Sequence, residues 1–103
     1  MSKPENPPLF GIDYLSLPEH MREPVRLYIE DGHPIGGFLT AIMANDFIEA
    51  VCKADEHNQM ALLEWARFIY NEAPGTCHGS YEIVREWQER GGLNGERAKR
   101  GES

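Results

Sequence analysis

The residues Gly36 to Glu56 read GGFLTAIMANDFIEAVCKADE and form the most apolar stretch of the chain. At about 100° per residue, their apolar side chains cover roughly 220° of a helical wheel, which is wider than one buried face. On the opposite polar strip, Glu49 and Lys53 have the i,i+4 spacing of an exposed ion pair. The pattern predicts a central helix over about residues 37–54 that needs packing partners on two sides. Its apolar arc consists of Leu39, Ala41, Met43, Ala44, Phe47, Ile48, Ala50, Val51, Cys52 and Ala54.

The composition of the chain is that of a globular protein with one core. It has 103 residues, 41% of them hydrophobic, and a net charge of −7. No apolar run approaches the ~18 residues of a membrane span, and the first residues lack an apolar signal region, so we expect a cytosolic location and no membrane contact. The acidic balance argues against binding to a nucleic-acid backbone, which requires a basic face. Because acids and bases alternate between Glu82 and Arg90, we interpret the charge as solubilising, with DNA mimicry as the alternative.

Proline and glycine place the first helix. Pro24 fits only the first turn of a helix, so this helix is expected to begin at about Glu23, after a brief turn through Met21. Gly32 supplies its end. The helix is therefore short, and its buried stripe contains Val25, Tyr28 and Ile29.

The segment 55–58 decides whether the central helix continues. One helix of about 35 residues would keep the apolar phase, but it far exceeds the usual mean of about 11–12. As a turn, Asp55 would cap a new helix and Asn58 would take its N3 position. We therefore predict a hairpin, with a third helix from about Glu56 to Glu72, and the single long helix as the alternative.

The last part of the chain predicts a fourth helix. Ser80 is a good N-cap for it, and Gly91 and Gly92 close it. The predicted fold class is all-α, a compact bundle of four main helices around the central one. Residues 1–17 are expected to form an extended lead-in, 18–93 the helical domain and 94–103 a mobile polar tail.

Most of the chain has a recognisable resemblance. The runs PEHMREPVRLYIEDGHPIGGFLTAIMANDFIEAVCKADEHN, LLEWARFIYNEAPGTCHGS and VREWQERGGL span about residues 18–93. They resemble small hypothetical proteins, without an assigned activity, that bacteriophages and prophages encode. The resemblance implies a setting in the host cytoplasm and no particular chemistry. By analogy with other phage accessory proteins of this size, it also implies an inhibitor of host or defence machinery.

The sequence offers little for catalysis or metal binding. Cys52 belongs to the apolar arc, and Cys77 beside His78 has no further ligand at a metal-binding spacing, so we predict two free thiols, no metal and no cofactor. Asp46 borders the apolar arc, and His57 or His78 could act as a base. No nucleophile elbow, phosphate loop, HExxH or paired-carboxylate spacing accompanies them. We therefore predict that the protein is not an enzyme.

Two kinds of binding remain. The loops Gly36-Gly37 and Gly75 to Ser80 lead into helix N-termini, where free N–H groups favour anions, so a phosphate-containing small molecule such as a signalling nucleotide is one candidate ligand. A host protein is the preferred partner, since an exposed apolar and acidic patch suffices for it. The sequence is also compatible with a homo-oligomer. Aromatic anchors to inspect are Trp65, Tyr70, Tyr81 and Trp87, and the candidate ligand- or partner-binding residues are Gly36, Gly37, Asn45, Asp46, His57, Asn58, Asn71, His78, Gly79 and Ser80.

Overall fold

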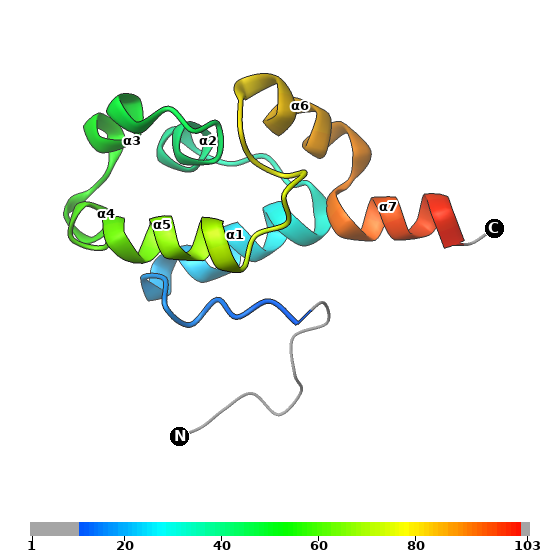
Figure 1. Ribbon diagram of the computed structural model, residues 1–103, viewed down its shortest axis with the longest axis horizontal. Coiled ribbons are helices and arrows are strands. Elements are labelled where there is room, and N and C mark those ends of the chain that lie inside the picture. The colour runs from blue at the N-terminus through cyan, green and yellow to red at the C-terminus, as the bar shows by residue number, and fades with distance from the viewer. Residues whose placement is uncertain (1–10, 102–103) are drawn as a thin grey trace.

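The computed structural model describes residues 11–101, and within that range the protein is built of helices without strands (Figure 1). The all-α class predicted from the sequence is therefore confirmed. The radius of gyration is 13.6 Å, close to the value of about 13 Å expected for a compact domain of 100 residues. None of the helices in this range is long and apolar enough to cross a lipid bilayer. The helices are α1 (Glu19–Asp31), α2 (Gly37–Met43), α3 (Phe47–Lys53), α4 (Glu56–Met60), α5 (Leu62–Asn71), α6 (Tyr81–Arg90) and α7 (Gly92–Gly101).

Helix α1 begins earlier than the sequence predicted. It starts at Glu19, so Pro24 lies inside it and not in its first turn. The start is held by Arg22, whose guanidinium donates hydrogen bonds of 3.0 Å to the carbonyl oxygens of Leu15 and Leu17. Because Pro24 has no N–H, α1 lacks the hydrogen bond to the carbonyl oxygen four residues earlier, and the burial of the apolar face offsets this loss. The predicted stop at Gly32 is confirmed, since Gly32 takes a left-handed conformation with φ 70°.

The predicted central helix over 37–54 is wrong, because the chain breaks between α2 and α3. Asn45 adopts φ 64°, a conformation that asparagine tolerates better than most residues. Asp46 then caps α3 by accepting a hydrogen bond of 3.3 Å from the backbone N–H of Glu49. The predicted pair of Glu49 with Lys53 forms at 3.2 Å. The apolar residues keep the same helical spacing on both sides of Asn45, so the sequence pattern does not indicate this turn.

The break exposes part of the predicted apolar arc. Phe47 and Ile48 are 67% and 69% exposed, and Cys52 is exposed as well, whereas the sequence pattern had placed all three in the core. Ala50 is fully buried. Helix α3 packs mainly against α2, so most of its circumference faces solvent.

The predicted turn at Asp55 is confirmed, whereas α3 does not pack closely along α4 or α5 as it would in a hairpin. Asp55 accepts a hydrogen bond of 2.7 Å from the N–H of Asn58 and so caps α4. The predicted single helix over 56–72 is divided at Ala61, whose N–H is shared between two carbonyl oxygens at 3.1 and 3.2 Å. The short α4 and the longer α5 together replace it.

The C-terminal region differs from the prediction of a mobile tail over 94–103. Ser80 caps α6 with a hydrogen bond of 3.1 Å to the N–H of Ile83, and Gly91 ends it at φ 84°, both as predicted. The chain then continues as α7, which packs against α1. Gly92 makes this contact close, since a Cβ added there would lie 2.7 Å from the backbone of Glu30. Residues 102 and 103 lie outside the described part.

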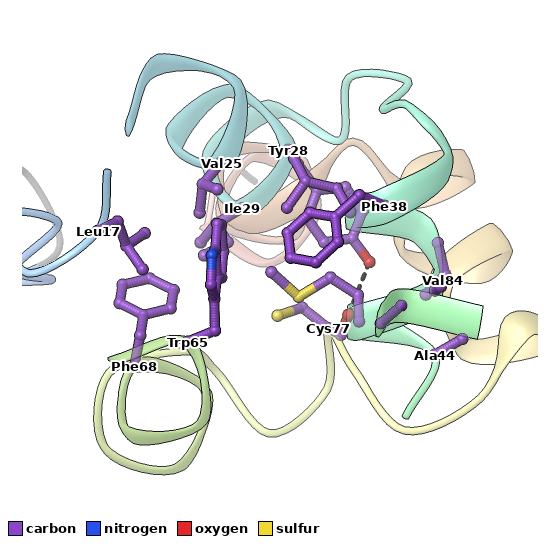
Figure 2. Close-up of a cluster of buried hydrophobic side chains, with 14 of the residues drawn as sticks. Leu17, Val25, Tyr28, Ile29, Phe38, Ala44, Trp65, Phe68, Cys77 and Val84 are labelled. Carbon is purple, nitrogen blue, oxygen red and sulfur yellow. Dashed lines mark hydrogen bonds between the residues drawn. The ribbon is translucent and has the colours of Figure 1, made fainter. Parts of the chain in front are cut away.

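The core lies between α1, α2, α5 and α6 (Figure 2). Trp65 and Trp87 are fully buried, as is Tyr28 of α1. The indole N–H of Trp87 donates to the carbonyl oxygen of Tyr28 at 3.0 Å, so the polar atom of this side chain is satisfied. From the predicted lead-in, Leu17 is also buried, while residues 1–10 of that segment lie outside the described part.

Candidate functional site

An open groove of about 500 Å³ lies between α3, α5 and the loop that precedes α6. Its walls are mainly apolar, and its polar residues come from the turn before α3 and from the loop before α6. The groove is a surface feature, because two aromatic residues that line it are largely exposed. The apolar lining consists of Ile42, Phe47, Ala50, Leu62, Ala66, Ile69 and Tyr70, and the polar lining of Asn45, Asp46, His78 and Gly79.

The α5 wall arises because this helix has a wider apolar face than the core uses. Trp65 and Phe68 point into the core, whereas Leu62, Ala66 and Ile69 lie on the neighbouring face at the i, i+4 and i+7 positions. Because the side chain of Ala66 is small, the α5 wall has a depression between Leu62 and Ile69.

Two aromatic side chains stand at the groove without a partner. Phe47 belongs to α3 and Tyr70 to α5, and they are 67% and 88% exposed. No ring pair or hydrogen bond within residues 11–101 involves either side chain. Leu63 and Ile48 on the same two helices are exposed too. Phe47 and Tyr70 both line the groove, and large exposed apolar patches mark interaction sites.

Asp46 supplies the negative charge of the groove. Its Oδ2 accepts a hydrogen bond of 2.7 Å from the hydroxyl of Tyr81, so the first residue of α6 is tied to the cap of α3. This hydrogen bond, together with the nearby carboxylate charge, raises the pKa of Tyr81 to about 12. The phenol, which is protonated at neutral pH, donates this hydrogen bond to the carboxylate of Asp46.

A backbone hydrogen bond anchors the loop before α6. The N–H of Gly79 donates to the carbonyl oxygen of Met43 at 2.7 Å, which connects the loop to the end of α2.

Burial lowers the pKa of His78 from its usual 6.5, so its imidazole is neutral at pH 7. Burial raises the pKa of the Cys77 thiol to about 12, which leaves it protonated and unreactive.

The groove brings together Asn45, Asp46, His78 and Gly79 from the predicted binding residues. Ser80 adjoins them, but its hydroxyl is used as the α6 cap. Tyr70, one of the predicted anchors, is exposed at the groove, whereas both tryptophans belong to the core.

The other predicted residues lie elsewhere or have structural roles. Asn58 is 2% exposed, and its Oδ1 accepts a hydrogen bond of 3.1 Å from the indole N–H of Trp65. His57 is at the surface beside His20, with ring centroids 5.8 Å apart, and Asn71 is exposed at the end of α5.

Gly36 and Gly37 also lie away from the groove lining, at the start of the seven-residue α2. The aliphatic part of Lys53 covers Gly37 so closely that an added Cβ would be 2.9 Å from its Cδ.

Sequence reasoning missed Phe47, which it had assigned to the core, and it did not single out Ala66. The available signal was the α5 pattern itself, because Leu62, Ala66, Ile69 and Tyr70 extend the apolar face beyond what Trp65 and Phe68 need for burial.

The groove offers a partner apolar contact surface and the negative charge of the Asp46 carboxylate. Within residues 11–101, no group of three His, Cys, Asp or Glu side chains is arranged to hold a metal ion. The carboxylate of Asp46 repels phosphate in the groove, while it favours a cationic group there.

Comparison with protein-family models, with curated proteins and with solved structures found no match to this chain.

Proposed function

We propose that the protein acts by binding another protein in a fixed ratio, without turnover, through the groove between α3 and α5. The observation that carries the proposal is the pair of exposed aromatic side chains, Phe47 and Tyr70, at an apolar groove. The resemblance to phage-encoded proteins suggests a host protein as the target, and inhibition or modulation of that protein as the effect.

The size of this surface supports a protein partner. An aromatic side chain buries about 150–250 Å² when it is fully covered. Phe47 and Tyr70 together could thus supply up to half of the ~800 Å² that each partner contributes to a typical interface. Leu63 and Ile48 extend the surface along the same two helices. Aromatic residues at the centre of such a patch contribute most of the binding energy in typical interfaces.

A variant that fills the groove tests the proposal. Ala66 is exposed on α5 and lines the groove, so Ala66→Arg adds bulk and positive charge there without removing a core contact. The matched control is Ala98→Arg, which changes an exposed alanine of α7. In affinity capture from a lysate of a bacterial host, we expect the wild type and Ala98→Arg to retain the same protein in a fixed ratio, and Ala66→Arg to lose it.

The same samples test the alternative ligand class. Mass spectrometry of released small molecules and thermal shift with nucleotides would reveal a phosphate-containing ligand, which at 100 times its Kd adds about 2.7 kcal/mol of stability. A clear shift with a nucleotide, or a captured protein that Ala66→Arg still retains, would contradict the proposal.

A further inference from the structure

The backbone of the groove walls limits what can occupy it. In α5 the N–H groups after the first turn and the C=O groups before the last turn are paired along the helix, and the side chains that α3 and α5 present to the groove are apolar. An extended peptide in the groove would find few partners for its own N–H and C=O groups along these walls. Each backbone group left without a partner carries a desolvation penalty, whereas a helix satisfies its backbone internally.

The polar residues of the groove come from two turns. Asn45 and Asp46 come from the turn before α3, and His78 and Gly79 from the loop before α6. Asp46 is the acidic side chain among the lining residues, and the imidazole of His78 adds no positive charge at neutral pH. Lys53, on the same helix as Phe47, is already paired with Glu49 at 3.2 Å. This part of the groove therefore attracts a cation, in agreement with the net charge of −7.

We propose that the occupant of the groove is an amphipathic helix of the partner protein, with apolar residues facing α5 and a lysine or arginine meeting the carboxylate of Asp46. This inference rests on the proposed function and specifies the chemistry of the partner. The partner's apolar residues are spaced i, i+3 or i+4, and i+7, because that is the stripe a helix presents along a groove.

The length of the wall sets the length of the partner helix. Helix α5 has ten residues and therefore extends about 15 Å. A partner helix of about three turns matches this length and places an apolar side chain between Phe47 and Tyr70. The basic residue follows at the end of the stripe that lies over Asp46.

A peptide selection tests this inference with the full chain as bait. Random peptides of about 16 residues, which is more than four helical turns, are displayed and selected for binding to the wild type, after depletion on Ala66→Arg. We expect the enriched peptides to carry the helical apolar spacing with a lysine or arginine at one end. Circular dichroism of a synthetic peptide should show a gain of helix on binding.

Substitutions then test the proposed contact between the basic residue of the peptide and the carboxylate of Asp46. Asp46→Asn removes the charge and keeps one oxygen that can cap α3, while its amide NH2 can donate to the hydroxyl oxygen of Tyr81 in place of the hydrogen bond that Asp46 accepts. We expect it to weaken binding of the peptide about two- to fivefold at low salt and to reduce the salt dependence. Glu89→Gln removes an exposed acid of α6 outside the groove lining and is expected to change neither.

The results separate the inference from the proposed function. Enriched peptides that bind in an extended form, that lack a basic residue, or that are indifferent to Asp46→Asn would overturn the inference, as would a selection that enriches none. If the host protein is still lost with Ala66→Arg in these cases, the proposed function stands alone. Retention of the host protein by Ala66→Arg would overturn both.

Discussion

The hydroxyl of Tyr28 donates a hydrogen bond of 2.6 Å to the carbonyl oxygen of Cys77, 49 residues further along the chain (Figure 2). Both residues are fully buried. The bond connects the middle of α1 to the loop that carries His78 and Gly79 to the groove. The shape of that part of the groove therefore depends on a core residue that lies outside the groove lining.

Tyr28→Phe should destabilise the protein by about 1–3 kcal/mol, because the buried carbonyl of Cys77 loses its donor while the ring is kept. Urea unfolding measures the change. Amide exchange of Gly79 should also become faster, since its loop loses an anchor. Tyr70→Phe, which removes a hydroxyl at the surface, serves as the control and should change the free energy of unfolding by less than about 0.5 kcal/mol. Equal stability of the two variants would contradict this prediction.

The contact between Asn58 and Trp65 predicts a structural role for Asn58. Asn58→Ala leaves the buried indole N–H without an acceptor and should cost about 1–3 kcal/mol in the free energy of unfolding. Trp65→Phe removes the donor, so the double variant should cost less than the sum of the two single variants. Additive costs in this double-mutant cycle would show that the hydrogen bond contributes nothing. Asn71→Ala is the exposed control.

Gly92 is predicted to be required for docking of α7. Its φ of 68° and its contact with the backbone of Ile29, Glu30 and Gly32 leave no space for a side chain. Gly92→Ala should therefore destabilise the protein by more than about 1–2 kcal/mol, and amide exchange in α7 should become faster. Gly75→Ala, at an exposed position with no neighbouring atom within 4 Å of an added Cβ, should have little effect. Similar unfolding curves for both variants would argue against close packing of α7 on α1.

The two cysteines are predicted to differ in reactivity. Cys52 is exposed and should react with a thiol reagent in the native protein, whereas Cys77 is buried and should react only after unfolding. Titration of the denatured protein should report two thiols. Protection of Cys52 in the native protein, or rapid reaction of Cys77, would contradict the burial of these residues.

The same burial predicts a loss of stability at alkaline pH. The pKa of Cys77 is about 12 in the folded protein against 9.0 for a free thiol, so the unfolded chain releases this proton first. The stabilising contribution is complete below pH 9.0 and declines as pH rises from there toward about 12, at up to about 1.4 kcal/mol per pH unit. Urea unfolding over this range measures the slope. Cys77→Ala should show a smaller slope, and an unchanged slope would exclude Cys77 as its source.

Local signals in the sequence predicted several helix ends correctly. The caps at Asp55 and Ser80 and the stops at Gly32 and Gly91 depend on hydrogen bonds and backbone angles within one turn, so the residues themselves indicate them. The turn at Asn45 was missed because the apolar phase continues across it, and Asn45-Asp46 can equally occupy the polar strip of a helix. The α3 side of the groove depends on that turn, since the turn exposes Phe47.

By itself, then, the sequence determined the all-α class, several helix ends and the polar residues of two turns, because these follow from local propensities and spacing. Only the tertiary structure decided which apolar residues form the core and which remain at the surface. Leu63 and Trp65 are both apolar residues of α5, but Leu63 is 58% exposed and Trp65 is fully buried. The burial of a side chain depends on which segments distant in the chain pack together, as Gly92 packs against α1. A local sequence pattern does not indicate such long-range contacts.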